Sequence, residues 1–256
     1  MIGLFDSGSG GLSVLQALRK RVPEVDIVYY GDIKHAPYGL RQQDELLDLA
    51  IGGIRTLRMF GAQEVVSACN TVAPSVLAHG AGDTRLIEMT RPAARAMRKH
   101  AGGRVLLLAT PATVDSKIYQ QLLDVIVVLD QLPIPKLAGA IEFGAPSEEI
   151  RTIVRAAFQT RWGQSYDHVF LGCTHFPLAQ HIIEEEARAA FGSLDIIDPA
   201  DAVADEAVRM FDMQGVGSTY FKLSQDSEHF RRRARELFSV EDENIAIIPG
   251  LGPQGY

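Results

Sequence analysis

The chain has 256 residues, of which 46% are hydrophobic and 22% are charged, as is typical of a globular protein with a real core. Its formal net charge of −7 argues against a general binding surface for nucleic acid or an anionic membrane, so we expect neither as a partner. No charged n-region followed by an apolar h-region opens the chain, and no apolar run approaches the roughly 20 residues of a membrane helix. We therefore expect a cytoplasmic protein.

Short apolar runs alternate with amphipathic stretches along most of the chain. The runs predicted as strands are Ile2–Phe5, Ile27–Tyr30, Glu64–Ala68, Leu86–Met89, Val105–Ala109, Val125–Leu129, Val169–Leu171 and Asp195–Ile197. Predicted helices include Gly11–Arg21, Gln43–Phe60, Arg91–His100 and Ser147–Thr160. This alternation predicts βαβ units, and hence an α/β fold with mainly parallel sheets.

Only two cysteines are present, Cys69 and Cys173. In a reducing compartment two cysteines so far apart in the chain are poor candidates for a disulfide. They lack CxxC spacing, and no cluster of His and Cys indicates zinc, so we expect no metal site. No motif in the sequence indicates a nicotinamide or flavin either, so we expect no cofactor. The two thiols need another explanation.

A weak internal repeat relates the two halves of the chain. An offset of 104 positions pairs Asp6 with Thr110, Cys69 with Cys173, and Tyr38 with Glu142. The text around the cysteines is also alike, VVSACNT at 65–71 against VFLGCTH at 169–175. We expect two related halves whose equivalent strand ends face each other across a cleft, where α/β folds bind ligands.

Two short loops are candidates for holding a substrate carboxylate. Asp6–Gly11 (DSGSGG) lies between a strand end and a helix start, where free N–H groups favour an anion. Ser13 stands where a dinucleotide fingerprint needs its third glycine, so a nucleotide is excluded; simple helix capping is the alternative. The loop Pro37-Tyr38-Gly39 would bring backbone donors or a hydroxyl to the cleft, or be an ordinary turn.

Both cysteines directly follow a predicted strand and precede polar residues, in Cys69–Thr71 and Cys173–His175. A thiol at a helix start lies near N–H donors and the helix dipole, and we expect these to lower its pKa from about 8.5. The neighbouring Asn and Thr side chains supply neutral donors for a carboxylate. A single buried cysteine would be interpreted as inert packing, but two in matching contexts indicate a functional pair.

Two thiols on opposite faces of a carbon atom suit racemisation, because one group removes the α-proton while the other returns a proton to the opposite face. Three ionisable residues are candidates for tuning these thiols. His175 lies two positions after Cys173, and Asp6 and Glu142 lie in the corresponding halves of the repeat. The alternatives are a capping role for His175 and a solvated carboxylate for Glu142.

Taken together, these residues resemble the glutamate racemase family, within the larger group of aspartate/glutamate racemases. The resemblance covers nearly the whole chain. The matching segments are IGLFDSGSGGLSVL at 2–15, YYGDIKHAPYG at 29–39, VVSACNT at 65–71, ATPATVDSKIY at 109–119, IE at 141–142, DHVFLGCTHFPL at 167–178, IIDPADAVA at 196–204 and YFKLSQDSEHFRRRARELF at 220–238.

The resemblance implies two pseudo-twofold-related α/β domains with the active site between them and a C-terminal segment that completes the first domain. We expect the first domain to comprise residues 1–91 and 200–256, and the second residues 92–199. It further implies cofactor-independent racemisation of glutamate, which supplies D-glutamate for peptidoglycan synthesis, and a homodimer.

The resemblance also implies roles for single residues. Cys69 should act on D-glutamate with support from Asp6, and Cys173 on L-glutamate with support from His175 and Glu142. The residues implied to contact the substrate are Asp6, Ser7, Pro37, Tyr38, Gly39, Cys69, Asn70, Thr71, Thr113, Cys173, Thr174 and His175.

Two segments depart from the family pattern. Val72-Ala73-Pro74 stands where small Ala or Ser residues are usual, and residues 131–140 match poorly. An alternative hypothesis therefore keeps the architecture with aspartate or another small dicarboxylate as substrate. A second alternative, from a different class, is a partner-binding protein or thiol sensor without turnover.

Overall fold

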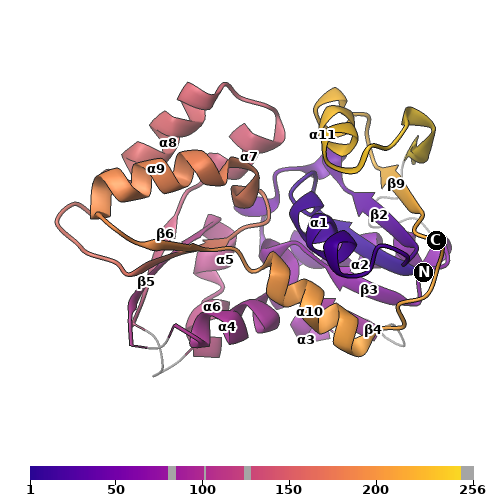
Figure 1. Cartoon of the computed structure of the whole chain (residues 1–256), viewed down its shortest axis with the longest axis horizontal. Helices are drawn as coiled ribbons and strands as arrows, with labels where there is room; N and C mark the ends of the chain where they lie inside the picture. The colour runs from indigo at the N-terminus through magenta and orange to yellow at the C-terminus, as the bar shows by residue number, and fades with distance from the viewer. Residues whose placement is uncertain (80–84, 101, 124–127, 249–256) are drawn as a thin grey trace.

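Two parallel sheets form the framework of the molecule and lie side by side in Figure 1. The structure is a computed structural model that describes residues 1–79, 85–100, 102–123 and 128–248. The first sheet has the order β10-β9-β2-β1-β3-β4 and the second β6-β5-β7-β8. The first comprises β1 Ile2–Asp6, β2 Ile27–Gly31, β3 Glu64–Ser67, β4 Arg85–Glu88, β9 Thr219–Leu223 and β10 Ile245–Ile247. The second comprises β5 Arg104–Ala109, β6 Val128–Pro133, β7 His168–Gly172 and β8 Asp195–Ile197.

Helices cover both faces of each sheet. Those of the first are α1 Leu12–Arg21, α2 Gln43–Met59, α3 Ala73–His79, α10 Ala200–Met210 and α11 Glu228–Phe238. Those around the second are α4 Thr90–Arg98, α5 Pro111–Asp115, α6 Ile118–Leu123, α7 Leu137–Glu142, α8 Ser147–Gln159 and α9 Gln180–Phe191. Short 3₁₀ turns are η1 Ile33–His35, η2 Tyr38–Leu40, η3 Asn70–Val72, η4 Phe176–Ala179 and η5 Asp242–Asn244. In the described parts of the chain, no helix is long and apolar enough to cross a membrane.

The strands are apolar on both sides because each sheet lies between two hydrophobic cores. In β1, Leu4 packs with the core under α1 and α10, whereas its neighbour Phe5 packs with the core under α2. In β5, Leu106 and Leu107 divide in the same way between the two cores of the second sheet. Continuous apolar runs are the pattern that a doubly covered parallel sheet requires, and the expected α/β fold is confirmed.

One predicted strand is wrong in its position. The expected strand Val125–Leu129 falls partly on residues 124–127, which lie outside the described residues, and β6 runs from Val128 to Pro133. Asp130 and Gln131 interrupt the apolar run, so the run ends before the strand does. Proline is tolerated at the end of β6 because this strand is at the edge of its sheet.

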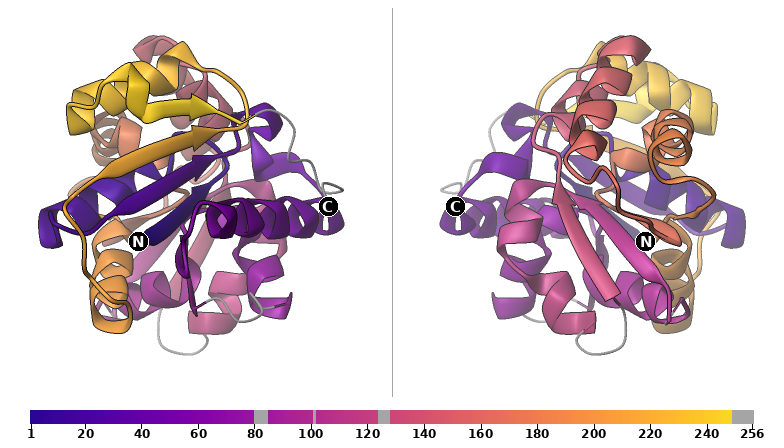
Figure 2. Two further views of the ribbon diagram at one scale, coloured as in Figure 1. Left: turned by 90° about the vertical axis from the view of Figure 1, so that its right-hand side faces the viewer. Right: turned by 90° about the vertical axis from the view of Figure 1, so that its left-hand side faces the viewer.

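The C-terminal segment returns to the first sheet. Strand β9 pairs in parallel with β2, and β10 continues the sheet beyond β9. Figure 2 (left) shows these yellow and orange segments beside the indigo N-terminal strands. Neither strand was predicted from the sequence pattern, although the family resemblance implied that this segment completes the first domain.

The internal repeat reappears in the topology. The strand order β2-β1-β3-β4 of the first sheet corresponds position by position to β6-β5-β7-β8 of the second. Cys69 follows β3 and Cys173 follows β7, so the offset of 104 relates equivalent strands. In keeping with this division of the strands, we propose domain boundaries at residues 1–91 with 200–256 and at residues 92–199.

Asp198 at the start of α10 makes the folding stability depend on pH. Burial raises its pKa to about 6, although the Ala200 N–H donates to its Oδ1 over 2.9 Å. Because the folded state holds the proton more tightly, the free energy of unfolding falls as the pH rises from about 4 to 6. We expect Asp198→Asn to raise it by roughly 1–3 kcal/mol at pH 8 and very little at pH 4.

Urea denaturation of the wild type and of Asp198→Asn at both pH values measures this difference. Asp115→Asn, at an exposed carboxylate, serves as the control. Equal stabilisation at pH 4 and pH 8 would show that Asp198 acts through packing and not through its charge.

Candidate active site

Both cysteines line one small cavity between the two sheets. Segments that follow β1, β3, β5 and β7 contribute to its wall, so the carboxyl edges of both sheets meet there. This is where α/β folds usually bind ligands. The cavity is about 10 Å³, near the minimum for a single water molecule of roughly 10–15 Å³. Its lining residues are Ser7, Pro37, Tyr38, Gly39, Cys69, Asn70, Thr71, Thr110, Ala138, Cys173, Thr174 and His175.

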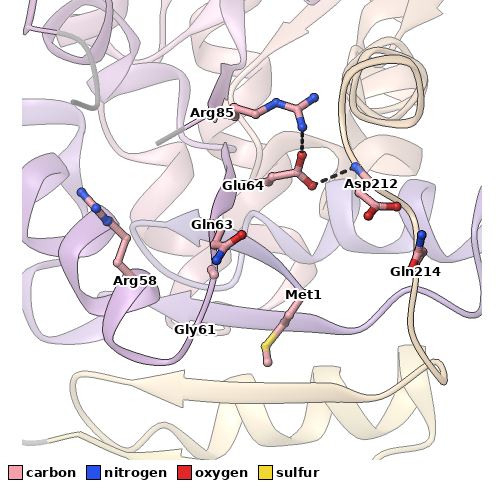
Figure 3. Close-up of a pocket in the computed structure, with 9 residues that line it drawn as sticks. Met1, Arg58, Gly61, Gln63, Glu64, Arg85, Asp212 and Gln214 are labelled. Atoms are coloured by element: carbon pink, nitrogen blue, oxygen red, sulfur yellow. Dashed lines mark hydrogen bonds and ion pairs between the residues drawn. The ribbon is translucent and has the colours of Figure 1, made fainter. Parts of the chain in front are cut away.

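A much larger hollow, of about 720 Å³, lies at the opposite, amino-terminal edge of the first sheet (Figure 3). Its deepest charged side chain, Glu64, is paired with Arg85 and accepts the Asp212 N–H over 2.9 Å. These charged groups therefore bind one another. Both cysteines lie in the smaller cavity, so the size of a hollow is a poor guide to the site here.

Cys69 lies directly after β3 and is only 4% exposed. Its Sγ donates to Ser7 Oγ over 3.7 Å. Burial raises the pKa of Cys69 to about 12, and the negative charges of Asp6 and Cys173 raise it further. The hydrogen bonds with the Ser7 hydroxyl and the Val72 N–H lower it too little to compensate. The expected lowering of the pKa is therefore wrong for Cys69, since η3 has three residues and its dipole is too small to outweigh burial.

Cys173 has a different partner. Its Sγ lies 3.9 Å from His175 Nδ1, and His175 Nε2 lies 2.6 Å from Glu142 Oε2. Burial by itself lowers the pKa of His175, but hydrogen bonds with Cys173 and Glu142, and the charges of both groups, raise it well above its ordinary value. A positively charged His175 ring therefore lies beside the Cys173 sulfur. The two cysteines thus differ in their surroundings, since Cys69 lies beside the neutral Ser7 hydroxyl and Cys173 beside an imidazolium.

The loop Ser7–Gly11 does bind a carboxylate, but that carboxylate belongs to the chain itself. Glu142 Oε2, from α7, accepts both the Ser9 N–H over 2.8 Å and the Ser9 hydroxyl over 2.7 Å. Although burial raises the pKa of Glu142, the His175 imidazolium and these Ser9 bonds lower it below its ordinary value. The alternative of a solvated Glu142 is wrong, because this side chain is 1% exposed. The loop therefore contributes Ser7 to the cavity while Ser9 fixes the Glu142–His175 pair.

Asp6 forms a second link between the sheets. Its Oδ2 accepts the Thr174 hydroxyl over 2.9 Å, and its Oδ1 accepts the Gly8 N–H over 3.0 Å. Burial raises the pKa of Asp6, against the charge of His175 and these hydrogen bonds. One carboxylate oxygen of Asp6 thus binds Thr174, next to Cys173, while the negative charge of Asp6 contributes to the high pKa of Cys69. Its support of Cys69 stays a prediction.

The loop after β2 brings Pro37, Tyr38 and Gly39 to the cavity wall. The Tyr38 hydroxyl donates to Asp32 Oδ2 over 2.5 Å, and His35 Nδ1 lies 2.9 Å from the same carboxylate. Burial first, and then the charge of Asp32, raise the pKa of Tyr38 well above its ordinary value. Tyr38 therefore keeps its proton and shapes the cavity, while Asp32 holds it in place.

Thr113 does not line the cavity, in contrast to the expectation. It is fully buried, and its hydroxyl lies 3.0 Å from that of Thr110, which in turn lies 3.0 Å from that of Thr71. The Thr110 side chain caps α5 and accepts the Thr113 N–H. Thr110 therefore lies between Thr71 and Thr113. Thr110 lines the cavity instead, and a contact of Thr113 with the substrate stays a prediction.

Several residues of the site were not identified from the sequence. Thr110 was noticeable through the offset of 104, since it corresponds to Asp6. Ser9 lies inside the DSGSGG motif, but its partner Glu142 is 133 positions away. Ala138 and Tyr119 carry no local signal, because only the packing of α7 and α6 brings them near the site.

The chemistry of the lining suits carboxylate groups. Ser7, Asn70, Thr71 and Thr174 contribute hydroxyl or amide side chains to the lining. Among the described residues, no group of three or more His, Cys, Asp or Glu side chains is arranged to hold a metal ion. Both thiols are buried, which limits the access of an oxidant and counts against a thiol sensor.

Gly10 allows His175 and Thr174 to lie close to the loop Asp6–Gly11. A β-carbon added there would lie 2.6 Å from both His175 Nδ1 and Thr174 Oγ1. We expect Gly10→Ala to lower kcat/KM by about 10–100-fold, because displacement of His175 misaligns it with Cys173. Steady-state kinetics with Gly52→Ala as the control checks this, since a β-carbon at Gly52 meets no atom within 4 Å. Equal activity of the two variants would show that His175 tolerates the displacement.

The fold and the paired cysteines place the chain in a class of racemases. Residues 9–207 match the family of Asp/Glu/Hydantoin racemases, and the chain belongs to this family. It is 31% identical to the glutamate racemase of Clostridium perfringens, over 95% of this chain and 92% of that protein. It is 33% identical to the glutamate racemase of Dinoroseobacter shibae, over 97% and 99% of the two chains. The crystal structure of glutamate racemase isoform RacE1 from Bacillus anthracis superimposes with a TM-score of 0.84, at 25% identity, over 98% of this chain and 97% of that one. The family resemblance is thus confirmed.

Proposed function

We propose that this protein interconverts L- and D-glutamate without a cofactor and uses Cys69 and Cys173 as its two acid/base groups. The main observation in support is that two cysteines at equivalent strand ends line one cavity and differ in their electrostatic surroundings. The relatives named as glutamate racemases support glutamate as the substrate.

In the L-to-D direction, the Cys173 thiolate removes the α-proton, so a bond forms between that proton and Sγ while the Cα–H electron pair moves toward the α-carboxylate. The Cys69 thiol then donates its proton to the opposite face of Cα. This leaves a thiol at Cys173 and a thiolate at Cys69, which is the state required for the reverse reaction. A protonated His175 assists by stabilising the Cys173 thiolate before the transfer.

The α-proton of an amino acid is a weak acid, so the developing negative charge needs stabilisation. In a closed, poorly hydrated cavity, hydrogen-bond donors on the carboxylate are more effective than in water. Asn70, Thr71 and Thr174 flank the two cysteines and carry such donors.

Incubation of the protein with L-glutamate in D₂O tests the proposed function. Loss of optical rotation with deuterium entering the α-position would support it. A folded, reduced sample that leaves glutamate unchanged but racemises aspartate would move the substrate assignment to the dicarboxylate alternative. Inactivity on both diacids would favour a binding protein.

Three wider statements belong with this proposed function. We propose a cytoplasmic location, because the mechanism needs both thiols reduced. The product D-glutamate would serve peptidoglycan synthesis. A homodimer is expected from the family, and light scattering of the purified protein would measure it.

A further inference from the structure

Tyr119 connects the two halves of the site through one side chain. It lies on α6 and is fully buried, with its ring edge-to-face against Phe170 of β7, the strand that leads to Cys173. Its hydroxyl donates to Oδ1 of Asn70 over 2.5 Å. Asn70 follows Cys69 and lines the cavity. A residue on a helix packed against the second sheet thus binds a polar side chain next to Cys69, which follows a strand of the first sheet.

The Tyr119 hydroxyl is a donor and not an acceptor in this contact. Burial raises the pKa of Tyr119 well above its ordinary value, and the charges of Glu88 and Cys173 raise it further. The phenol therefore keeps its proton, and a buried O–H needs an acceptor. The carbonyl oxygen of the Asn70 amide satisfies it, whereas an amide NH₂ in the same place would leave the proton without a partner.

This contact leaves the other end of the Asn70 amide for the cavity. Asn70 is 2% exposed, and its Nδ2 has no hydrogen-bond partner among the described residues. A buried NH₂ group without a partner costs about 1–3 kcal/mol, unless a ligand accepts its hydrogen bonds. An NH₂ group donates to a carboxylate, but it cannot accept from a substrate ammonium.

We propose that Tyr119 is a positioning residue: it holds the Asn70 amide with its NH₂ group toward the cavity, so that Asn70 binds a carboxylate of the substrate and not its ammonium group. This inference rests on the proposed function for the identity of the substrate, but the orientation of Asn70 is a property of the free protein.

Tyr119→Phe removes only the hydroxyl. We expect kcat/KM to fall about tenfold in both directions, chiefly through a higher KM, because the freed amide no longer presents its donors in one orientation. In an Asn70→Ala background the same change should alter kcat/KM by less than about twofold. Tyr166→Phe, at another buried tyrosine in the outer core of the second sheet, is the matched control and should leave both constants unchanged. An equal loss with and without the Asn70 amide would overturn the positioning role.

Asn70→Asp tests the direction of the donors. With Tyr119 bound to one carboxylate oxygen, the other oxygen would face the substrate carboxylate, so this variant should be less active than Asn70→Ala. If Asn70→Asp is the more active of the two, Asn70 does not bind a carboxylate.

A measurement without turnover separates this inference from the proposed function. In ¹⁵N-labelled protein, the Asn70 side-chain NH₂ signals are assigned by their loss in Asn70→Ala. They should shift and exchange faster with water in Tyr119→Phe. Unchanged signals would overturn the inference even if the enzyme racemises glutamate, whereas an inactive wild type with shifted signals would overturn only the proposed function.

Discussion

Alanine at either Cys69 or Cys173 is expected to abolish racemisation in both directions, with a loss of about 10³-fold or more in kcat/KM. No other thiol lines the cavity, and its remaining polar side chains are hydroxyls, an amide and His175, whose ring is bound to Glu142 and lies on the Cys173 side. Because the equilibrium constant of a racemisation is one, kcat/KM must fall equally for both enantiomers. Circular dichroism of the reaction, started from L- and then from D-glutamate, measures the loss.

The single variants also assign each thiol to one face of the substrate. In D₂O, Cys69→Ala should slowly exchange the α-proton of L-glutamate through Cys173 alone, without forming D-glutamate. Cys173→Ala should do the same with D-glutamate. Serine variants keep the size of the side chain but have a much less acidic proton, so they control for packing. Normal turnover in Cys69→Ala would contradict the two-thiol mechanism.

Loss of the charge at Glu142 should have the second largest effect. In Glu142→Gln the buried His175 loses the anion 2.6 Å from its Nε2, so burial lowers its pKa and the imidazole becomes neutral. A neutral His175 no longer stabilises the Cys173 thiolate. We expect kcat/KM to fall by about 10²–10³-fold. The primary isotope effect should rise with α-deuterated L-glutamate, because proton removal by Cys173 becomes slower than the other steps.

The pH profile distinguishes this role from a structural one. In the wild type, protonated His175 persists well above its ordinary pKa, so the alkaline limb of kcat/KM should move to lower pH in Glu142→Gln. The contribution of His175 to folding stability is present below the pKa that His175 has in the unfolded chain, and it is lost as the pH rises through the higher pKa of the folded state. The contribution of Glu142 is present above the pKa that Glu142 has in the unfolded chain, and it is lost as the pH falls through the lower pKa of the folded state. Glu184→Gln, at a surface carboxylate paired with Arg188, is the control. A lower kcat with an unshifted alkaline limb would show that Glu142 acts only through packing.

Much of the architecture follows from local pattern. The apolar runs at Ile2–Phe5 and Val105–Ala109 predicted strands because a doubly covered parallel sheet needs both faces apolar. The placement of Cys69 and Cys173 at equivalent strand ends followed from one offset in the sequence, and the matching strand order of the two sheets agrees with it. Chemistry at strand ends could be predicted because the carboxyl edge of a parallel sheet gathers residues that are distant in sequence.

The electrostatic state of the site was decided by tertiary structure. No local pattern in the sequence reveals that Glu142 binds Ser9, or that Tyr119 orients Asn70. Each pair joins a helix of the second sheet to a loop of the first sheet. Tertiary structure also decides the pKa of Cys69. Its position at a helix start predicted a lowered pKa, whereas burial raises it. Sequence determines which groups follow a strand. The free energy of a charge depends on how much water remains around it and on which opposite charges lie within a few ångströms, and only the packed structure determines both.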